Sequence, residues 1–96
     1  MQSLPAGIQA DIERAVSCLK SMGAAEVFLF GSLSTDTWDE SSDIDLAIRG
    51  LEPERFFEAY ALASRDLGRE LDLVDLDREK PMAEFLAETK RLVRIA

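Results

Sequence analysis

Residues 31–48 read GSLSTDTWDESSDIDLAI: a glycine–serine pair, ten further residues, and then D-I-D at 43–45. The five residues before them, EVFLF at 26–30, are apolar and aromatic. A short apolar run closed by glycine is typical of a buried strand that ends in a turn. Residues 31–42 are mostly polar and small, and a connection of that length inside a compact domain is typically functional. We therefore expect this stretch both to determine the fold and to carry functional residues.

The residues from Asp43 onward alternate in character, which predicts a strand with one face in the core. The two predicted faces are Asp43, Asp45 and Ala47 on one side and Ile44, Leu46 and Ile48 on the other. Two like charges about 6.5–7 Å apart on one strand face repel each other, and aspartate suits strand interiors poorly. A cation between the two groups would stabilise the pair, and Mg²⁺ commonly takes one or two carboxylates together with substrate phosphates. A solvated surface pair is the alternative interpretation.

The rest of the chain predicts helices that cover a small mixed sheet. Helical spacing of apolar residues predicts helices over 5–22 and from Pro53 to the glycine at 68, and a third that follows Asp77 as its N-cap. Further strands are expected over 70–76 (ELDLVDL) and, briefly, over 92–95. The order is typical of an α/β (α+β) fold, and 96 residues fit one domain spanning 1–96.

Composition excludes several classes of site. The chain carries a net charge of −8 and no histidine. A surface this acidic repels phosphate backbones, so direct binding of nucleic acid is not expected. Without histidine, Ser-His-Asp, Cys-His and zinc–histidine sites are excluded, and catalysis must rely on carboxylates and a hard metal ion. The single cysteine, Cys18, is interpreted as a small core or boundary residue.

The sequence indicates no membrane segment or signal peptide. No apolar run approaches the ~20 residues that span a bilayer, and the first ten residues lack a basic start and an apolar stretch. A cytoplasmic location is therefore expected.

Asp72 offers a third carboxylate. It lies in ELDLVDL on the face shared with Glu70 and Val74, so it can approach Asp43 and Asp45 if the two strands are neighbours. Such a triad could hold one or two metal ions and activate a hydroxyl for attack on phosphorus. A second D-x-D pair, at 75 and 77, lies where a strand gives way to a helix, and a structural role is favoured there.

Gly31 and Ser32 are candidates for binding phosphate, which carboxylates alone cannot do. After a buried strand, glycine lets the backbone turn sharply and lets a phosphate approach the N–H groups. A short helix or nest that begins at Ser32 would present free N–H groups and a hydroxyl to phosphate oxygens. As a bare dipeptide, Gly-Ser is also compatible with a plain turn.

On these residues the sequence resembles the minimal nucleotidyltransferase (MNT) family, a branch of the DNA polymerase β-like nucleotidyltransferases. GSLSTDTWDESSDIDLAI fits the family pattern G-S-x10-D-x-D, and ELDLVDLD resembles its third-carboxylate strand. The resemblance implies that Asp43, Asp45 and Asp72 bind Mg²⁺ and catalyse, and that Gly31 and Ser32 hold nucleotide phosphates. It also implies transfer of a nucleoside monophosphate from ATP to an acceptor hydroxyl.

Family members this short are often antitoxins. The partner is a helical HEPN-domain ribonuclease toxin, silenced by adenylylation of a tyrosine or by being held in a complex. One departure bears on this choice: the family's basic loop after Gly-Ser is replaced here by a loop with three acidic residues, Asp36, Asp39 and Glu40. Added negative charge opposes triphosphate binding, and Arg49 could offset it or lie on the surface.

Three functions therefore stay open. The first is an Mg²⁺-dependent enzyme that transfers AMP to a partner HEPN toxin. The second is a catalytically weak or inactive antitoxin of the same fold that neutralises its partner by complex formation. The third is a small acidic domain without nucleotide chemistry. A chain of this size could also need a homo- or hetero-oligomeric partner to cover a sheet edge, and the lone Trp38 is a candidate for contact with a partner, packing over the sheet or stacking on adenine.

Overall fold

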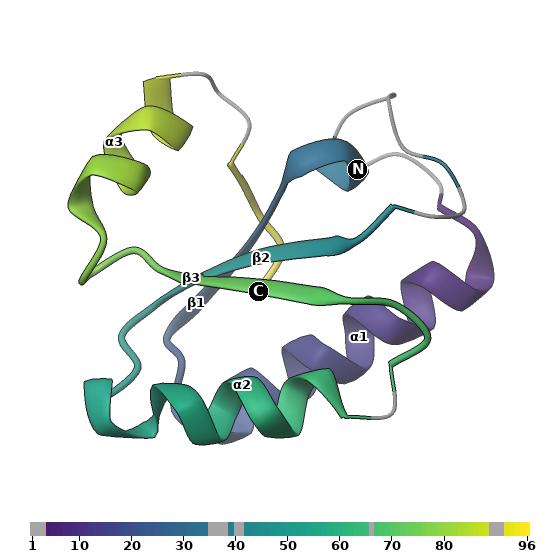
Figure 1. The fold of residues 1–96 in the computed structure, drawn as a ribbon, viewed down its shortest axis with the longest axis horizontal. Coiled ribbons are helices and arrows are strands. Elements are labelled where there is room, and N and C mark those ends of the chain that lie inside the picture. The colour runs from purple at the N-terminus through teal and green to yellow at the C-terminus, as the bar shows by residue number, and fades with distance from the viewer. Residues whose placement is uncertain (1–3, 35–38, 40–41, 66, 89–91) are drawn as a thin grey trace.

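A four-stranded mixed sheet flanked by helices forms the domain (Figure 1). The computed structural model describes residues 4–34, 39, 42–65, 67–88 and 92–96. The elements in chain order are α1 (Ala6–Ser21), β1 (Glu26–Phe30), the 3-10 turn η1 (Gly31–Ser34), β2 (Ile44–Arg49), the 3-10 turn η2 (Pro53–Arg55), α2 (Phe56–Ser64), β3 (Leu71–Asp75), α3 (Lys80–Glu88) and β4 (Val93–Arg94). The predicted α+β fold is confirmed.

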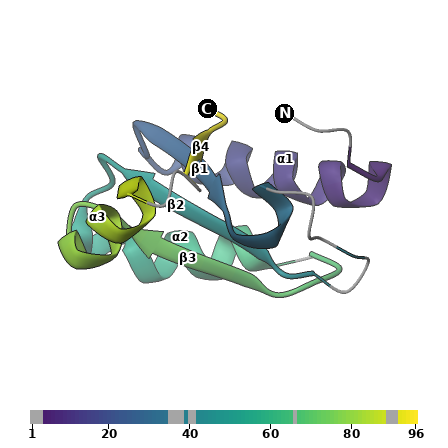
Figure 2. The same ribbon diagram turned by 90° about the horizontal axis from the view of Figure 1, so that it is seen from above.

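The strand order is β3-β2-β1-β4. β1 runs antiparallel to both β2 and β4, whereas β2 and β3 are parallel and are joined by the crossover through α2. Figure 2 shows the short β4 beside β1 at one edge of the sheet. Because β2 and β3 are parallel, they begin at the same end of the sheet, and the predicted site residues lie at that end.

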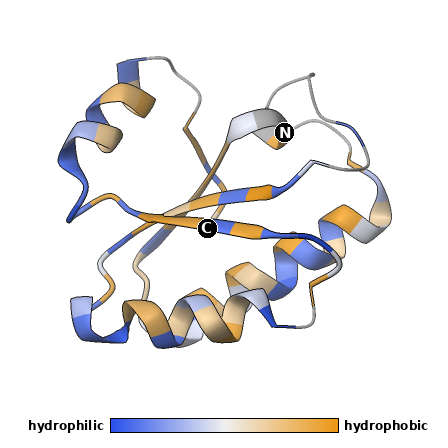
Figure 3. Cartoon of the chain, viewed as in Figure 1, coloured by the Kyte–Doolittle hydropathy of each residue, from blue (hydrophilic) through white to orange (hydrophobic). Residues whose placement is uncertain are grey.

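One face of the sheet packs on α1 and α2, which lie together below the strands in Figure 1. The predicted apolar stripe of α1 is buried there together with alternate residues of the strands. Figure 3 shows the hydrophobic residues along α1 and the strands in orange. These core residues include Ile8, Ile12, Leu19, Val27, Leu29, Ile44, Leu46 and Ile48. In the described segments no helix has the length and apolar character needed to cross a membrane.

The opposite face is covered only in part. Leu86 of α3 packs with Phe28, Ala47 and Val74 in a second, smaller cluster. Those three strand residues are paired across β1, β2 and β3. The next row on the same face is the one that carries the carboxylates.

Candidate active site

Phe30, Asp45 and Asp72 form a row across three neighbouring strands. Phe30 pairs with Asp45 in the β1–β2 ladder, and Asp45 pairs with Asp72 in the β2–β3 ladder. Asp43 directly precedes β2 and is exposed, as is Asp72, whereas Asp45 is half-buried. The register therefore brings Asp45 and Asp72 together from positions far apart in the sequence, beyond the part of the sheet that α3 covers.

Gly31 is the point at which the chain leaves β1 and enters η1. Its φ is +74°, in the left-handed region that glycine adopts readily. A Cβ at this position would overlap the Oδ2 atom of Asp45. The glycine thus has two functions: it makes the turn, and it leaves room for the Asp45 carboxylate against the backbone.

The carboxylates at this end of the sheet affect one another electrostatically. The pKa of Asp45 is raised from 3.8 to about 6, first by burial and then by the negative charges of Asp72 and Asp43. Both causes disfavour the ionised form. A cation placed among these groups would oppose both, so Asp45 ionises most easily when positive charge is nearby.

The donor set suits a hard metal ion, although it does not form a closed cage. Within the described ranges, no three His, Cys, Asp or Glu side chains are gathered closely enough to hold a metal by themselves. Repulsion between like charges disfavours a tighter grouping of these carboxylates when no cation lies between them. Mg²⁺ commonly takes only one or two carboxylates and completes its octahedron with water and substrate phosphates. The residues present therefore fit Mg²⁺ bound together with a nucleotide.

Hydrogen bonds hold the start of both carboxylate-bearing strands. The N–H of Ile44 donates to the Glu70 carbonyl at 2.9 Å. The hydroxyl of Tyr60 donates to the Leu71 carbonyl at 2.8 Å and ties α2 to β3 beside Asp72. Sequence reasoning missed Arg69, whose side chain donates to the Ser42 carbonyl at 3.0 Å. The only signal for Arg69 was its place just before a carboxylate-bearing strand, and that signal does not reveal burial.

The second D-x-D pair has a structural role, but not the one predicted. Asp77 does not cap α3, because α3 begins at Lys80. Instead its Oδ2 accepts a hydrogen bond from the Gly50 N–H at 2.8 Å, and its own N–H donates to Asp75 Oδ1 at 3.0 Å. These bonds join the ends of β2 and β3, at the opposite end of the sheet from Asp45.

Arg49 does not reach the carboxylates. It is the last residue of β2, and its guanidinium lies 5.7 Å from the centre of the Phe28 ring. It lies four positions along the extended strand from Asp45, a span of about 13 Å. Of the acidic loop, Asp39 is described and exposed, whereas Asp36, Trp38 and Glu40 lie outside the described residues. The side chain of Ser32 is likewise outside the description.

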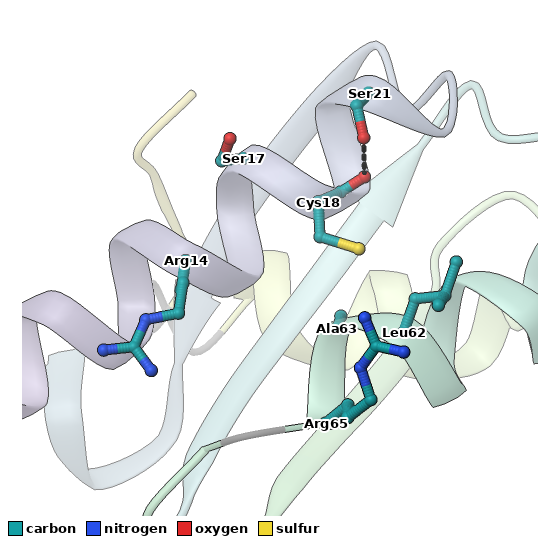
Figure 4. Close-up of a pocket in the computed structure, with 7 residues that line it drawn as sticks. All are labelled: Arg14, Ser17, Cys18, Ser21, Leu62, Ala63 and Arg65. Atoms are coloured by element: carbon teal, nitrogen blue, oxygen red, sulfur yellow. Dashed lines mark hydrogen bonds between the residues drawn. The ribbon is translucent and has the colours of Figure 1, made fainter.

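A separate pocket of about 440 Å³ lies between α1 and α2 (Figure 4). Its lining includes Cys18, Ser21 and Arg65. The Ser21 hydroxyl donates to the Cys18 carbonyl within α1 rather than into the pocket, and Arg14 points away from Arg65. The polar groups do not converge, so this pocket is a gap between two helices and Cys18 is the boundary residue that was expected.

Solved structures with the same fold include toxin–antitoxin proteins. One, described as a toxin–antitoxin with AMP-PNP, has a TM-score of 0.68 and 23% identity over 85% of this chain and 69% of that chain. A mutant of the toxin–antitoxin MntA-HpeT has a TM-score of 0.67 and 20% identity over 85% of this chain and 69% of that chain. A second MntA-HpeT mutant has a TM-score of 0.67 and 21% identity, over 88% and 71%. The sequence matches no curated protein.

The family model named "Polymerase beta, Nucleotidyltransferase" matches residues 13–94. The match spans α1 from its second turn, the Gly31 turn, both carboxylate-bearing strands and β4. The chain therefore belongs to the polymerase beta nucleotidyltransferase family.

Proposed function

We propose that this domain is an Mg²⁺-dependent nucleotidyltransferase that transfers AMP from ATP to a hydroxyl, a tyrosine, of a partner HEPN toxin, and so acts as an antitoxin. The observation that carries the proposal is the row formed by Asp45 and Asp72 in register, with Asp43 before it and the Gly31 turn against it. The family of the chain supports nucleotidyl transfer. The fold shared with toxin–antitoxin proteins, one of them described with AMP-PNP, supports the partner and the nucleotide.

In this proposal each residue has a separate task. Asp43, Asp45 and Asp72 would hold Mg²⁺, which would neutralise phosphate charge and align the triphosphate with the attacking hydroxyl. The Gly31 turn and Ser32 would lie against the phosphates. The hydroxyl oxygen forms a bond to the α-phosphorus, the bond from that phosphorus to the bridging oxygen breaks, and pyrophosphate leaves with the electron pair. The hydroxyl proton passes to a carboxylate or to water.

Label transfer tests this proposal. The protein is incubated with Mg²⁺, ATP labelled at the α-phosphate, and the protein encoded by the adjacent gene. We expect labelled partner with the wild type and a loss of at least about 100-fold with Asp43→Asn/Asp45→Asn, because removing catalytic electrostatic groups costs rates of that order. Glu54→Gln/Glu58→Gln is the matched control, since it removes two exposed charges from η2 and α2. Transfer that persists in the aspartate variant would refute the assignment.

A second function is favoured by the acidic loop. Asp36, Asp39 and Glu40 stand where the family carries basic residues, and their charges oppose triphosphate binding. In this alternative the domain neutralises the toxin by complex formation alone. The Asp43→Asn/Asp45→Asn variant would then still protect cells from the partner, and no ATP binding would be measurable. Loss of protection by a variant that is expressed normally and still forms the complex would exclude this alternative.

A further inference from the structure

One polar contact at the start of β2 is made by a half-buried side chain, that of Arg69. Arg69 lies just before β3, and its side chain is only 18% exposed. Its Nη1 donates to the Ser42 carbonyl at 3.0 Å, and its Nε lies 3.6 Å from Oδ2 of Asp11 on α1. One guanidinium therefore joins α1 to the end of the loop that leads into β2.

Asp11 is built to hold that guanidinium. It is a buried carboxylate on the core side of α1, where a charge without a partner would be costly. Its Oδ2 also accepts a hydrogen bond from the Gly68 N–H at 3.3 Å, and Arg14 lies 4.0 Å from its Oδ1. The segment 68–69 is thus fixed to α1 through both its backbone and its side chain.

Hydrogen bonds to residues 69 and 70 hold the backbone on both sides of Asp43. The residue before it, Ser42, accepts through its carbonyl from Arg69. The residue after it, Ile44, donates its N–H to the Glu70 carbonyl at 2.9 Å. Ser42 is also bonded twice to Asp39: its N–H donates to the Asp39 carbonyl and its hydroxyl accepts from the Asp39 N–H. The exposed Asp43 side chain is therefore carried on a backbone held from both sides.

We infer that Arg69, anchored by Asp11, is the positioning residue that holds the backbone of Asp43, so that its carboxylate stays at the end of the sheet that carries Asp45 and Asp72. The inference rests on the proposed function for its consequence, metal binding, but the geometry it names can be measured without metal. Arg69 acts through the Ser42 carbonyl and is not assigned contact with substrate.

Arg55 provides a matched control. Like Arg69, it donates from Nη1 to a distant backbone carbonyl at 3.0 Å, in this case that of Met22. It lies in η2, beyond the opposite end of β2 from Asp43. Arg69→Met and Arg55→Met each remove one guanidinium and one such bond, and Arg69→Met also removes the ion pair with Asp11. Measuring the stability of both variants therefore separates a local effect at the carboxylates from a general loss of stability.

The experiment compares amide hydrogen exchange at Ile44 and binding of Mn²⁺ alone, as a spectroscopic substitute for Mg²⁺, in the folded wild type and variants. With Arg69→Met we expect Ile44 to lose protection and Mn²⁺ affinity to fall about tenfold or more, as for other residues that support metal ligands. With Arg55→Met both should stay at wild-type values. Arg69→Lys, which keeps a charged donor, should recover part of both losses.

The outcomes are separable. Unchanged Ile44 protection and Mn²⁺ affinity in folded Arg69→Met would overturn the inference and reduce Arg69 to a structural joint. If the wild type binds no Mn²⁺ either alone or with ATP, while Arg69→Met still loses Ile44 protection, the positioning is supported and the proposed function is contradicted. If Arg69→Met does not fold, Asp11→Asn is used instead, because it keeps the acceptor for the Gly68 N–H but removes the charge that faces Arg69. Smaller losses of Ile44 protection and of Mn²⁺ affinity are then expected. The absence of both losses would overturn the inference.

Discussion

At the scale of single residues, Asp45 makes the stability of the free protein depend on pH. Its pKa in the fold is about 6, above the ordinary value of 3.8, so the folded state binds this proton more tightly than the unfolded state does. The contribution of Asp45 to stability is therefore most favourable below pH 4, declines as the pH rises from about 4 to about 6, and stays unfavourable above that range.

Asp45→Asn should remove this penalty. Without metal at pH 8 the variant should be more stable than the wild type by roughly 1 kcal/mol, a value reduced from the full pKa shift because Asp45 is only half-buried. The gain should shrink as the pH falls through 6 and vanish near pH 4. Thermal unfolding of both proteins at several pH values checks this, and a gain that does not vary with pH would contradict it.

Gly31→Ala should be costly for a reason that is independent of charge. The left-handed backbone at this position alone costs an alanine about 1–2 kcal/mol, and the added Cβ must also displace the Asp45 carboxylate. Gly7→Ala is the control, because Gly7 lies in α1 with open space around it, and alanine there should stabilise the helix by up to about 1 kcal/mol. Relative to the wild type, the midpoint of urea unfolding should fall for Gly31→Ala and rise for Gly7→Ala.

At the scale of elements, a hydrogen bond from the Tyr60 hydroxyl to the Leu71 carbonyl links α2 to β3. Tyr60→Phe should cost about 1 kcal/mol, the usual net value of one hydrogen bond. Phe57→Leu, on the same helix but 78% exposed, should stay within about 0.5 kcal/mol of the wild type. Chemical denaturation gives both values, and a cost of Tyr60→Phe no larger than that of Phe57→Leu would contradict the prediction.

Local patterns predicted the elements well where the determinants are local. The residues 26–30 form β1 with the predicted bounds, because an apolar run closed by a glycine at positive φ specifies its own end. The start of the last helix was predicted wrongly, since Asp77 bonds to Gly50, which is distant in sequence. The predicted second helix begins as the 3-10 turn η2 and continues as α2. A proline at the first position is compatible with either kind of helix, so the sequence did not predict the 3-10 turn.

The candidate site was predictable in its carboxylates and not in its supports. Strand alternation placed Asp45 on the face opposite Ile44 and Leu46, and the structure has this arrangement. The approach of Asp72 depended on which strands are neighbours, which the register now gives. Arg69 could not be distinguished from the other arginines, because burial beside Asp11 is a property of the assembled fold. The metal and phosphate roles of these residues stay predictions.

At the scale of the whole molecule, metal binding should follow the ionisation of Asp45. Because a carboxylate must lose its proton to bind a metal, affinity for Mn²⁺ should fall roughly tenfold between pH 7.5 and pH 5, as expected for one group with a pKa of about 6. Calorimetric titration at fixed ionic strength checks this, since the net charge of −8 attracts any cation nonspecifically at low salt. Affinity that is independent of pH, or unchanged in Asp43→Asn/Asp45→Asn, would contradict the site.

The close approach of Gly31 to Asp45 also restricts how this protein can evolve. A side chain can enter position 31 only if position 45 becomes smaller or moves away. In a library randomised at both positions and selected for folding alone, partners other than glycine at 31 should appear with glycine or alanine at 45. Each such combination lacks the carboxylate at position 45. Sequences that accept a side chain at position 31 therefore regain the fold but lose a group that the proposed reaction needs.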